Sequence, residues 1–274
     1  MKKYFILFIV MFLIVETTAF AQIFKNKDLA ISELEEHVWV VETSDNTTMY
    51  IIEGEEKSML IDTGTKCDKL DEVVRKITTK PLYVVLTHFH PDHAGNIQYF
   101  DKIYMHEAET PLISMMNIAY KGEIGFVKNG DVFDLGGKKI NVVFTPGHTP
   151  GSIVLVDTQA GSCYTGDAFG SGMVWLQLEP YTPMSTYIES CNKMEQIMED
   201  KNITRIYCGH YPYVKKAFDK SYIVDMRLLA ENMLNGTAPE AKPFEMKPSI
   251  GAKNPMIVTS GEVSIVYDPE RIKK

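Results

Sequence analysis

The sequence predicts an α/β fold in which two β-sheets lie between outer helices. Three observations support this prediction. After an N-terminal segment of 21 residues, the chain has short β-rich segments, continues with alternating strand and helix segments, and returns to strands near its end. Its 274 residues are 45% hydrophobic and 23% charged, which is typical of a globular protein and excludes a disordered tail or a multi-span membrane protein.

The first half of this pattern begins with four segments rich in β-branched and apolar residues, each bounded by turn formers. They predict strands at Leu29–Leu34, Val38–Thr43, Thr48–Glu53 and Ser58–Ile61. Apolar residues at helical spacing predict a helix over Asp68–Ile77, and a continuous apolar run predicts a buried strand over Leu82–Leu86. A second helix is expected over Glu107–Met116 despite Pro111, because a proline is tolerated in the early turn of a helix.

The second half repeats these signals and adds two long helices. Strands are predicted at Val132–Leu135, Ile140–Phe144, Ile153–Asp157, Cys163–Tyr164 and Ile203–Cys208. Helices are predicted over Pro183–Asp200, with Thr182 as the N-cap, and over Tyr222–Leu234. Ser260-Gly261 predicts a hairpin of Met256–Thr259 and Glu262–Tyr267, preceded by a loop over Gly236–Asn254.

The N-terminus has the pattern of a secretory signal. Lys2 and Lys3 precede the apolar run Tyr4–Val15, and Ala19-Phe20-Ala21 forms an A-x-A cleavage site. The alternative is a membrane anchor, but this run has 12 residues and a bilayer span needs about 20. We therefore expect cleavage near Ala21, a periplasmic or extracellular product without a stable membrane anchor, and one hydrolase domain over residues 22–274.

The charge balance argues against a nucleic-acid partner. There are 28 Lys and Arg against 36 Asp and Glu, which gives a net charge of −8. Nucleic-acid binders normally carry a basic face. The four cysteines show no C-x-x-C spacing, so their pairing stays open between disulfides and buried thiols. A small-molecule substrate is expected, and the oligomeric state is not indicated.

A cluster of histidines follows the strand predicted over Leu82–Leu86. His88 and His90 share one face of an extended segment, whereas Asp92 and His93 follow a turn and face a second point. Nitrogen and oxygen donors at two neighbouring points are the ligands that a pair of zinc ions prefers. The alternative is a polar loop with chance histidines.

Further donors stand at the ends of other predicted strands. His148, Asp167 and His210 each come directly after a glycine, which permits a sharp turn and a close backbone approach. Taken singly, Asp167 could cap a helix and His210 could be an ordinary loop residue. Taken together with the first cluster, they predict one metal-binding site.

With these motifs the sequence resembles the metallo-β-lactamase superfamily. The resemblance depends on His88-x-His90-x-Asp92-His93, then His148, Asp167 and His210, preceded by Leu60-Ile61-Asp62-Thr63-Gly64. It implies an αββα sandwich with the metals at the edge between the two β-sheets. It also implies that His88, His90 and His148 hold one zinc ion, that Asp92, His93 and His210 hold the other, and that Asp167 bridges them. Asp62 would orient a ligand.

The resemblance also implies the chemistry. It implies hydrolysis by a metal-bound hydroxide, with Asp92 as the catalytic residue that orients the nucleophile. Two zinc ions are the expected cofactors, while iron and manganese stay open. Di-iron members of the superfamily usually carry Glu where His90 stands, which favours zinc.

The substrate is less constrained by the sequence. β-Lactamases of this fold typically carry Cys or Ser where this chain has Asp167, whereas glyoxalase II and lactonases carry Asp. We therefore expect cleavage of an ester, lactone, thioester or related acyl bond. The alternatives are a β-lactamase, a phosphodiesterase or a non-catalytic zinc-binding protein. The side chains expected to line an apolar substrate pocket are Phe169, Trp175, Tyr211 and Tyr213, unless they pack in the core.

Overall fold

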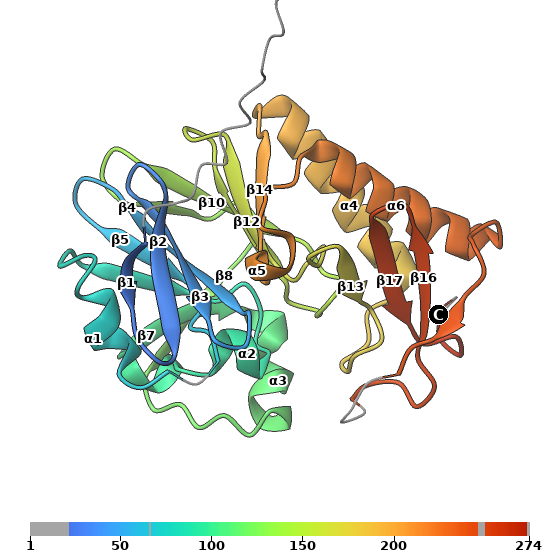
Figure 1. Cartoon of the computed structure of the whole chain (residues 1–274), viewed down its shortest axis with the longest axis horizontal. Coiled ribbons are helices and arrows are strands. Elements are labelled where there is room, and N and C mark those ends of the chain that lie inside the picture. The colour runs from blue at the N-terminus through green and yellow to red at the C-terminus, as the bar shows by residue number, and fades with distance from the viewer. Residues whose placement is uncertain (1–21, 66, 246–249, 273–274) are drawn as a thin grey trace, which may run out of the picture.

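The structure is a computed structural model that describes residues 22–65, 67–245 and 250–272. Two large β-sheets face each other, with helices on their outer sides, and a third, small sheet lies at one end of the molecule (Figure 1). The predicted αββα sandwich is therefore confirmed, with this small sheet as an addition. The predicted secretory signal lies outside the described residues.

The first sheet has eight strands in chain order. The first five pair antiparallel and the last four pair parallel. β4 and β5 are buried along nearly their whole length, because both faces of the sheet are covered. The strands are β1 (Gln22–Lys25), β2 (Leu29–Glu35), β3 (Val38–Thr43), β4 (Thr48–Glu53), β5 (Ser58–Ile61), β6 (Leu82–Val85), β7 (Lys102–His106) and β8 (Glu123–Val127).

The second sheet has five strands in the order β14-β12-β11-β10-β9. Only the β12–β14 pair is parallel, so both of these strands end at the same edge. The strands are β9 (Val132–Asp134), β10 (Lys139–Phe144), β11 (Ile153–Asp157), β12 (Ser162–Gly166) and β14 (Arg205–Cys208).

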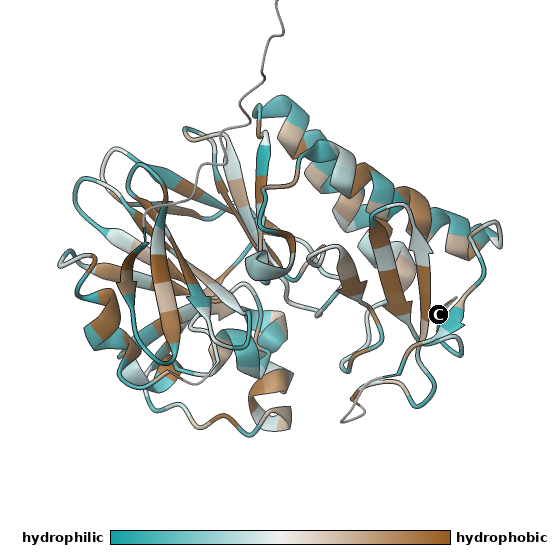
Figure 2. Ribbon diagram, in the orientation of Figure 1, coloured by the Kyte–Doolittle hydropathy of each residue, from teal (hydrophilic) through white to brown (hydrophobic). Residues whose placement is uncertain are grey.

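Helices cover the outer face of each large sheet. The helices of the first half are α1 (Leu70–Val74), α2 (Pro91–Ala94) and α3 (Thr110–Met115), with 3-10 turns at Ile97–Tyr99 and Glu107–Glu109. The later helices are α4 (Met184–Asp200), α5 (Tyr211–Val214) and α6 (Lys220–Asn235). α4 and α6 pack on each other and present their apolar sides to the sheets (Figure 2).

The small sheet has the order β13-β17-β16-β15. Its β16 (Met256–Ser260) and β17 (Val263–Tyr267) form the predicted hairpin, which is confirmed. β13 (Met173–Trp175) adds to it in parallel, and β15 (Lys242–Pro243) is a short edge strand within the predicted loop. The sheet packs on α6, so the C-terminal residues form one wall beside the second large sheet.

Several local predictions were wrong or incomplete. The N-cap position of α4 is Pro183, and the hydroxyl of Thr182 is buried without a partner among the described residues. The helix predicted over Glu107–Met116 begins as a 3-10 turn and becomes α-helical only at Thr110. All four cysteines are buried free thiols. Among the described residues, no helix has the length and apolar character needed to cross a bilayer.

Candidate metal centre

The seven predicted ligands lie together, at loops that follow β6, β10, β12 and β14. They form two adjoining groups, and within each group one possible ligand atom per residue lies within 4.8 Å of the others. The three-histidine group consists of His88, His90 and His148. The mixed group consists of Asp92, His93, Asp167 and His210. We refer to both groups together as the metal centre.

Four of these residues, His88, His90, Asp92 and His93, follow β6 directly, and the backbone changes from extended to helical between His90 and Asp92. His90 has an extended backbone and is the N-cap of α2, and Pro91 begins the helix because its fixed φ suits the first turn. Asp92 and His93 therefore lie on a helical turn, away from the extended segment that carries His88 and His90. The short helix thus separates the two groups.

Hydrogen bonds fix the tautomers of the histidines. His148 Nδ1 lies 2.9 Å from the Trp175 carbonyl oxygen, and His210 Nδ1 lies 3.1 Å from that of Asn46. A carbonyl oxygen only accepts, so Nδ1 carries a hydrogen in both rings and Nε2 is the nitrogen left to face a metal ion. The Nε2 of His148 faces His90 Nδ1 at 2.9 Å. In His148 and His210 the hydrogen bond at Nδ1 holds the ring in one orientation, so that Nε2 points to the place where a metal ion would bind.

Asp62 and Thr87 extend this arrangement beneath the metal centre. Asp62 Oδ2 lies 2.8 Å from His93 Nδ1, and Asp62 Oδ1 accepts a hydrogen bond of 2.7 Å from the Thr87 amide. The Thr87 hydroxyl also donates to Asp62 Oδ2 at 2.8 Å and lies 3.1 Å from His88 Nδ1. One buried carboxylate therefore orients two imidazoles.

Asp167 lies between the two groups. Its Oδ2 is 3.2 Å from His210 Nε2 and 3.6 Å from His93 Nε2, both in the mixed group. The same oxygen is 3.9 Å from His148 Nε2 in the three-histidine group. A single carboxylate oxygen thus reaches nitrogens of both groups, which is the position a bridging ligand requires.

Electrostatics differ between the two groups. Burial holds the pKa of His88 well below its usual value, and burial with the nearby His148 lowers the pKa of His90 to about 3. Burial also lowers the pKa of His93 and His210, but the neighbouring carboxylates raise it by more. Asp92 and Asp167 raise the pKa of His93 to about 10, and Asp167 raises the pKa of His210 to about 12. In the metal-free protein, neutral imidazoles thus face a group of opposite charges.

The donors present fit bound cations. Three buried atoms of the metal centre have no hydrogen-bond partner among the described residues: His88 Nε2, His93 Nε2 and Asp167 Oδ1. Buried polar atoms are nearly always paired, so such a concentration of unpaired polar atoms at one place calls for a ligand. Imidazole and carboxylate donors suit zinc. The residues therefore fit a two-metal site.

Gly209 permits this close approach. A Cβ at this position would collide with Asp167 Oδ1 and would lie 2.7 Å from His93 Cε1. The Gly209 amide instead donates to the Gly166 carbonyl at 2.8 Å and joins the ends of β12 and β14. Only a residue without a side chain brings Asp167 and His210 this close.

The four predicted pocket residues have different environments. Phe169 is 1% exposed and packs against Tyr187 in the core, so it offers no surface to a substrate. Trp175 is half-buried and makes a T-shaped contact with Phe244. Tyr213 is 65% exposed and stacks on His210, with ring centroids 5.6 Å apart.

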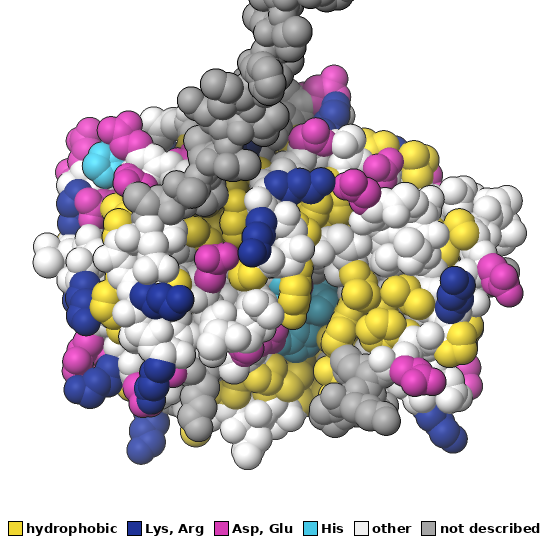
Figure 3. Space-filling view, in the orientation of Figure 1, with side chains coloured by type: hydrophobic (Ala, Val, Ile, Leu, Met, Phe, Trp, Pro, Cys, Tyr) yellow, Lys and Arg dark blue, Asp and Glu magenta, His cyan; other side chains and the backbone are white. Residues whose placement is uncertain are grey.

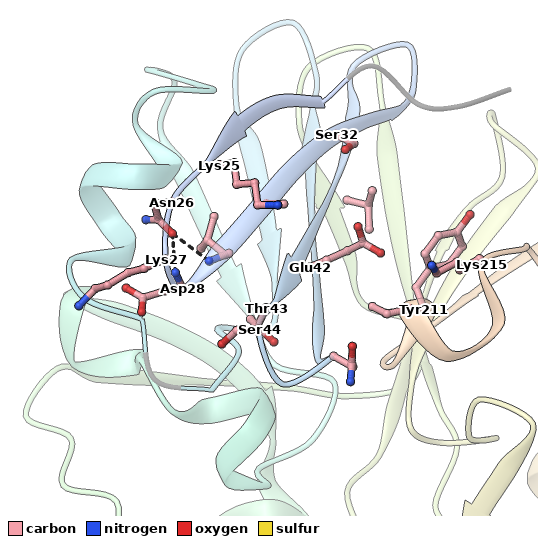
Figure 4. Close-up of a pocket in the computed structure, with 15 residues that line it drawn as sticks. Lys25, Asn26, Lys27, Asp28, Ser32, Glu42, Thr43, Ser44, Tyr211 and Lys215 are labelled. Carbon is pink, nitrogen blue, oxygen red and sulfur yellow. Dashed lines mark hydrogen bonds between the residues drawn. The ribbon is translucent and has the colours of Figure 1, made fainter.

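Tyr211 instead lines a separate groove of about 720 Å³ between β1–β3 and α5 (Figure 4). None of the seven donors lines this groove.

The metal centre opens to solvent at a hollow. Near the middle of Figure 3, histidine side chains lie at the base of this hollow and hydrophobic side chains border it. Sequence reasoning did not find Asn46, Thr87, Glu109 or Phe244, which contact the predicted ligands, their loops or Trp175. No metal-site motif marks Asn46, Glu109 or Phe244, and Asn46 acts through its backbone.

Known proteins with similar sequences and folds agree with this geometry. A sequence model of the metallo-beta-lactamase superfamily matches residues 43–210, more than half of the chain. The acyl-coenzyme A thioesterase MBLAC2 of Gallus gallus is 24% identical over an alignment of 208 positions, and the match covers 62% of this chain and 74% of that protein. The human protein of the same name is also 24% identical, over 62% of this chain and 75% of its own length.

Among solved structures, a metallo-beta-lactamase from Pontibacter korlensis has the same fold, with a TM-score of 0.60 and 19% identity. The match covers 74% of this chain and 99% of that one. The superfamily match and the thioesterase-named relatives identify the chain as a hydrolase, and the two donor groups give it a place for metal. The chain is a metal-dependent hydrolase that belongs to the metallo-beta-lactamase superfamily.

Proposed function

We propose that the chain is an exported di-zinc hydrolase of acyl bonds, with acyl thioesters as its first substrate class. The observation that carries this proposal is the pair of adjoining donor groups, joined by Asp167, at the base of a hollow with an apolar border. Named thioesterases among the relatives favour thioesters over other acyl bonds.

The seven donors of the metal centre would serve as ligands for two metal ions. The three-histidine group would hold one zinc ion, the mixed group the other, and Asp167 would contact both. When bound, the two ions supply positive charge that polarises a carbonyl group and acidifies water. The chain fixes the donors beforehand, because Asp62, Asn46 and the Trp175 carbonyl hold the rings in one orientation.

Asp92 is the carboxylate best placed to accept a proton from water and to pass it on. Its side chain is 36% exposed, more than the side chains of His93, Asp167 and His210 around it, so it is the most accessible of the four to water. His93 and the hydrogen bond from His210 outweigh burial and lower the Asp92 pKa to about 2, which keeps this carboxylate ionised. We infer that Asp92 orients the attacking water and passes its proton to the leaving thiolate.

The acyl chain would lie against the small sheet. Trp175 and Phe244 present a half-buried aromatic surface there, and Met173 on the same strand is 37% exposed. Because the Trp175 carbonyl accepts from His148, this surface is fixed relative to the metal centre. Apolar walls beside a few convergent polar groups are typical of small-molecule sites.

The test is a substrate panel for the purified, zinc-loaded protein. The panel contains acyl-coenzyme A thioesters of several chain lengths, lactones, β-lactams and a phosphodiester. We expect thioesters to be cleaved fastest and expect Asp167→Asn to abolish the activity. His37→Asn is the matched control, because His37 is exposed, has a left-handed backbone and lies outside the metal centre. Cleavage of β-lactams or phosphodiesters alone would overturn the proposal.

Export is tested separately, with the full chain expressed in a bacterium. We expect the periplasmic or secreted product to begin at Gln22, as measured by intact mass. An uncleaved product that stays in the cytoplasm would overturn this part and leave the acyl-bond proposal standing.

A further inference from the structure

Glu109 is a buried carboxylate outside the metal centre. It ends the 3-10 turn Glu107–Glu109 and is 0% exposed. Within the described part of the chain, no Lys, Arg or His forms an ion pair with it. Burying an unpaired charge in a protein carries a large desolvation cost. A carboxylate kept in such a place needs strong hydrogen bonds to hold it there.

Those hydrogen bonds come from two loops that carry metal ligands. Glu109 Oε2 accepts from the Phe89 amide at 2.6 Å, and Phe89 stands between His88 and His90. Glu109 Oε1 accepts from the Gly151 amide at 2.7 Å, three residues after His148. Each oxygen therefore holds one of the two loops that supply the three-histidine group.

The contact between Glu109 and Gly151 requires a residue without a side chain at position 151. A Cβ at Gly151 would lie 2.6 Å from Glu109 Cγ and Oε1, closer than real Cβ atoms approach other atoms. A residue with a side chain would push the carboxylate away from one or both amides. The hydrogen bond between Glu109 and the Gly151 amide therefore depends on both residues: on the carboxylate of Glu109 and on the missing side chain of Gly151.

We propose that Glu109 is a positioning residue that sets the separation of the His88–His90 segment and the His148 loop. The proposal rests on the proposed zinc centre. Without the carboxylate, other bonds still hold each loop near its place, because Ile153 donates to the Thr87 carbonyl and Thr145 donates to the Ser152 carbonyl, both at 2.9 Å. Loss of Glu109 should therefore loosen the three-histidine group without dissolving the fold.

The experiment compares Glu109→Gln with Glu107→Gln, an exposed carboxylate two residues earlier. The Gln amide offers one acceptor oxygen, so Phe89 or Gly151 must face an N–H group. We expect the affinity for the first equivalent of zinc, measured by chelator competition, to fall about 10- to 100-fold in Glu109→Gln. The visible absorption of the cobalt-loaded protein should change as well. Glu107→Gln should behave as the wild type.

Gly151→Ala provides a second route to the same state. It should weaken zinc binding to a similar degree, and the double variant Gly151→Ala with Glu109→Gln should be no worse than either single one. Should Glu109→Gln fail to fold, Glu109→Asp keeps the charge but reaches one loop at most, so it should give the same loss of zinc affinity.

The readouts separate the two proposals. Unfolding of the metal-free variants by urea reports any purely structural role. Reduced stability with unchanged zinc affinity and unchanged cobalt spectrum overturns the positioning role alone. A wild-type protein that binds no zinc overturns the zinc centre, and the positioning role with it.

Discussion

His93 Nδ1 lies 2.8 Å from Asp62 Oδ2, and both side chains are almost completely buried. Asp62 has a left-handed backbone with φ of 62°, a conformation that Asn adopts readily and most other residues do not. The pair therefore combines a strained backbone position with a buried ionic hydrogen bond. Such features persist where the surrounding structure requires them.

The first prediction follows from this pair. Asp62→Asn should keep the left-handed backbone but weaken the hold on His93, because a neutral amide replaces the carboxylate. We expect zinc affinity of the mixed group to fall about 10- to 100-fold. Chelator competition measures this loss, and Asp134→Asn is the control, because Asp134 is an exposed carboxylate on β9 that accepts from the Gly136 amide. Unchanged zinc affinity in Asp62→Asn would show that the Asp62 carboxylate is not needed to orient His93 for zinc binding.

The second prediction concerns Gly209. In Gly209→Ala the new Cβ collides with Asp167 Oδ1 and approaches His93 Cε1, so the mixed group must open. Bound zinc per molecule, measured by elemental analysis, should fall from two to one or fewer. Gly261→Ala is the control: its Cβ meets nothing, and its φ of +58° should cost about 1 kcal/mol of stability with no loss of zinc. Two zinc ions in Gly209→Ala would contradict the prediction.

The third prediction is a stability maximum near pH 6.5 for the metal-free protein. Unfolded histidine has a pKa of about 6.5. His88 and His90 have lower folded values, so the stability they contribute is lost as the pH falls from 6.5 toward 3. His93 and His210 have raised folded values, so their contribution is complete below pH 6.5 and is lost as the pH rises from there toward about 10 for His93 and about 12 for His210.

Urea unfolding between pH 4 and 9 in the presence of a chelator measures this profile. With saturating zinc the alkaline decline should disappear, because the metal needs deprotonated ligands and binds more tightly as the pH rises. A metal-free profile that is flat, or that rises steadily above pH 7, would count against the charge states described here.

Much of the fold was predictable from local patterns. Strands such as Val38–Thr43 and Thr48–Glu53 combine β-branched residues with clear turn boundaries, and the structure has them at the predicted positions. β7 and β8 were not predicted. They are five residues long, β8 contains a glycine, and both are partly exposed near the end of the sheet, so tertiary pairing rather than propensity forms them.

The metal centre was predictable for a different reason. A run of histidines after a buried strand marks His88 to His93, and a glycine directly before the residue marks His148, Asp167 and His210, without any knowledge of contacts. The residues that orient them were largely hidden. Asn46 and Trp175 act through carbonyl oxygens, which every residue has, and Glu109 is 20 positions from Phe89. Only the folded chain brings these groups to the ligands.

The last prediction tests the apolar wall. In Trp175→Leu the backbone carbonyl still accepts from His148, so the zinc content should stay at the wild-type level. The lost aromatic surface should raise KM for long acyl thioesters about tenfold, since about 1.4 kcal/mol of lost apolar contact corresponds to that factor. Short acyl thioesters should be cleaved at nearly the wild-type kcat/KM.

Steady-state kinetics across a series of acyl lengths measures this effect. Trp39→Leu is the matched control, because the other tryptophan of the chain packs against the core between the first sheet and its helices. It should lower stability without changing the dependence on acyl length. If Trp175→Leu lowers kcat equally for short and long substrates, the wall acts on the metal ligands through His148 and does not hold the acyl chain.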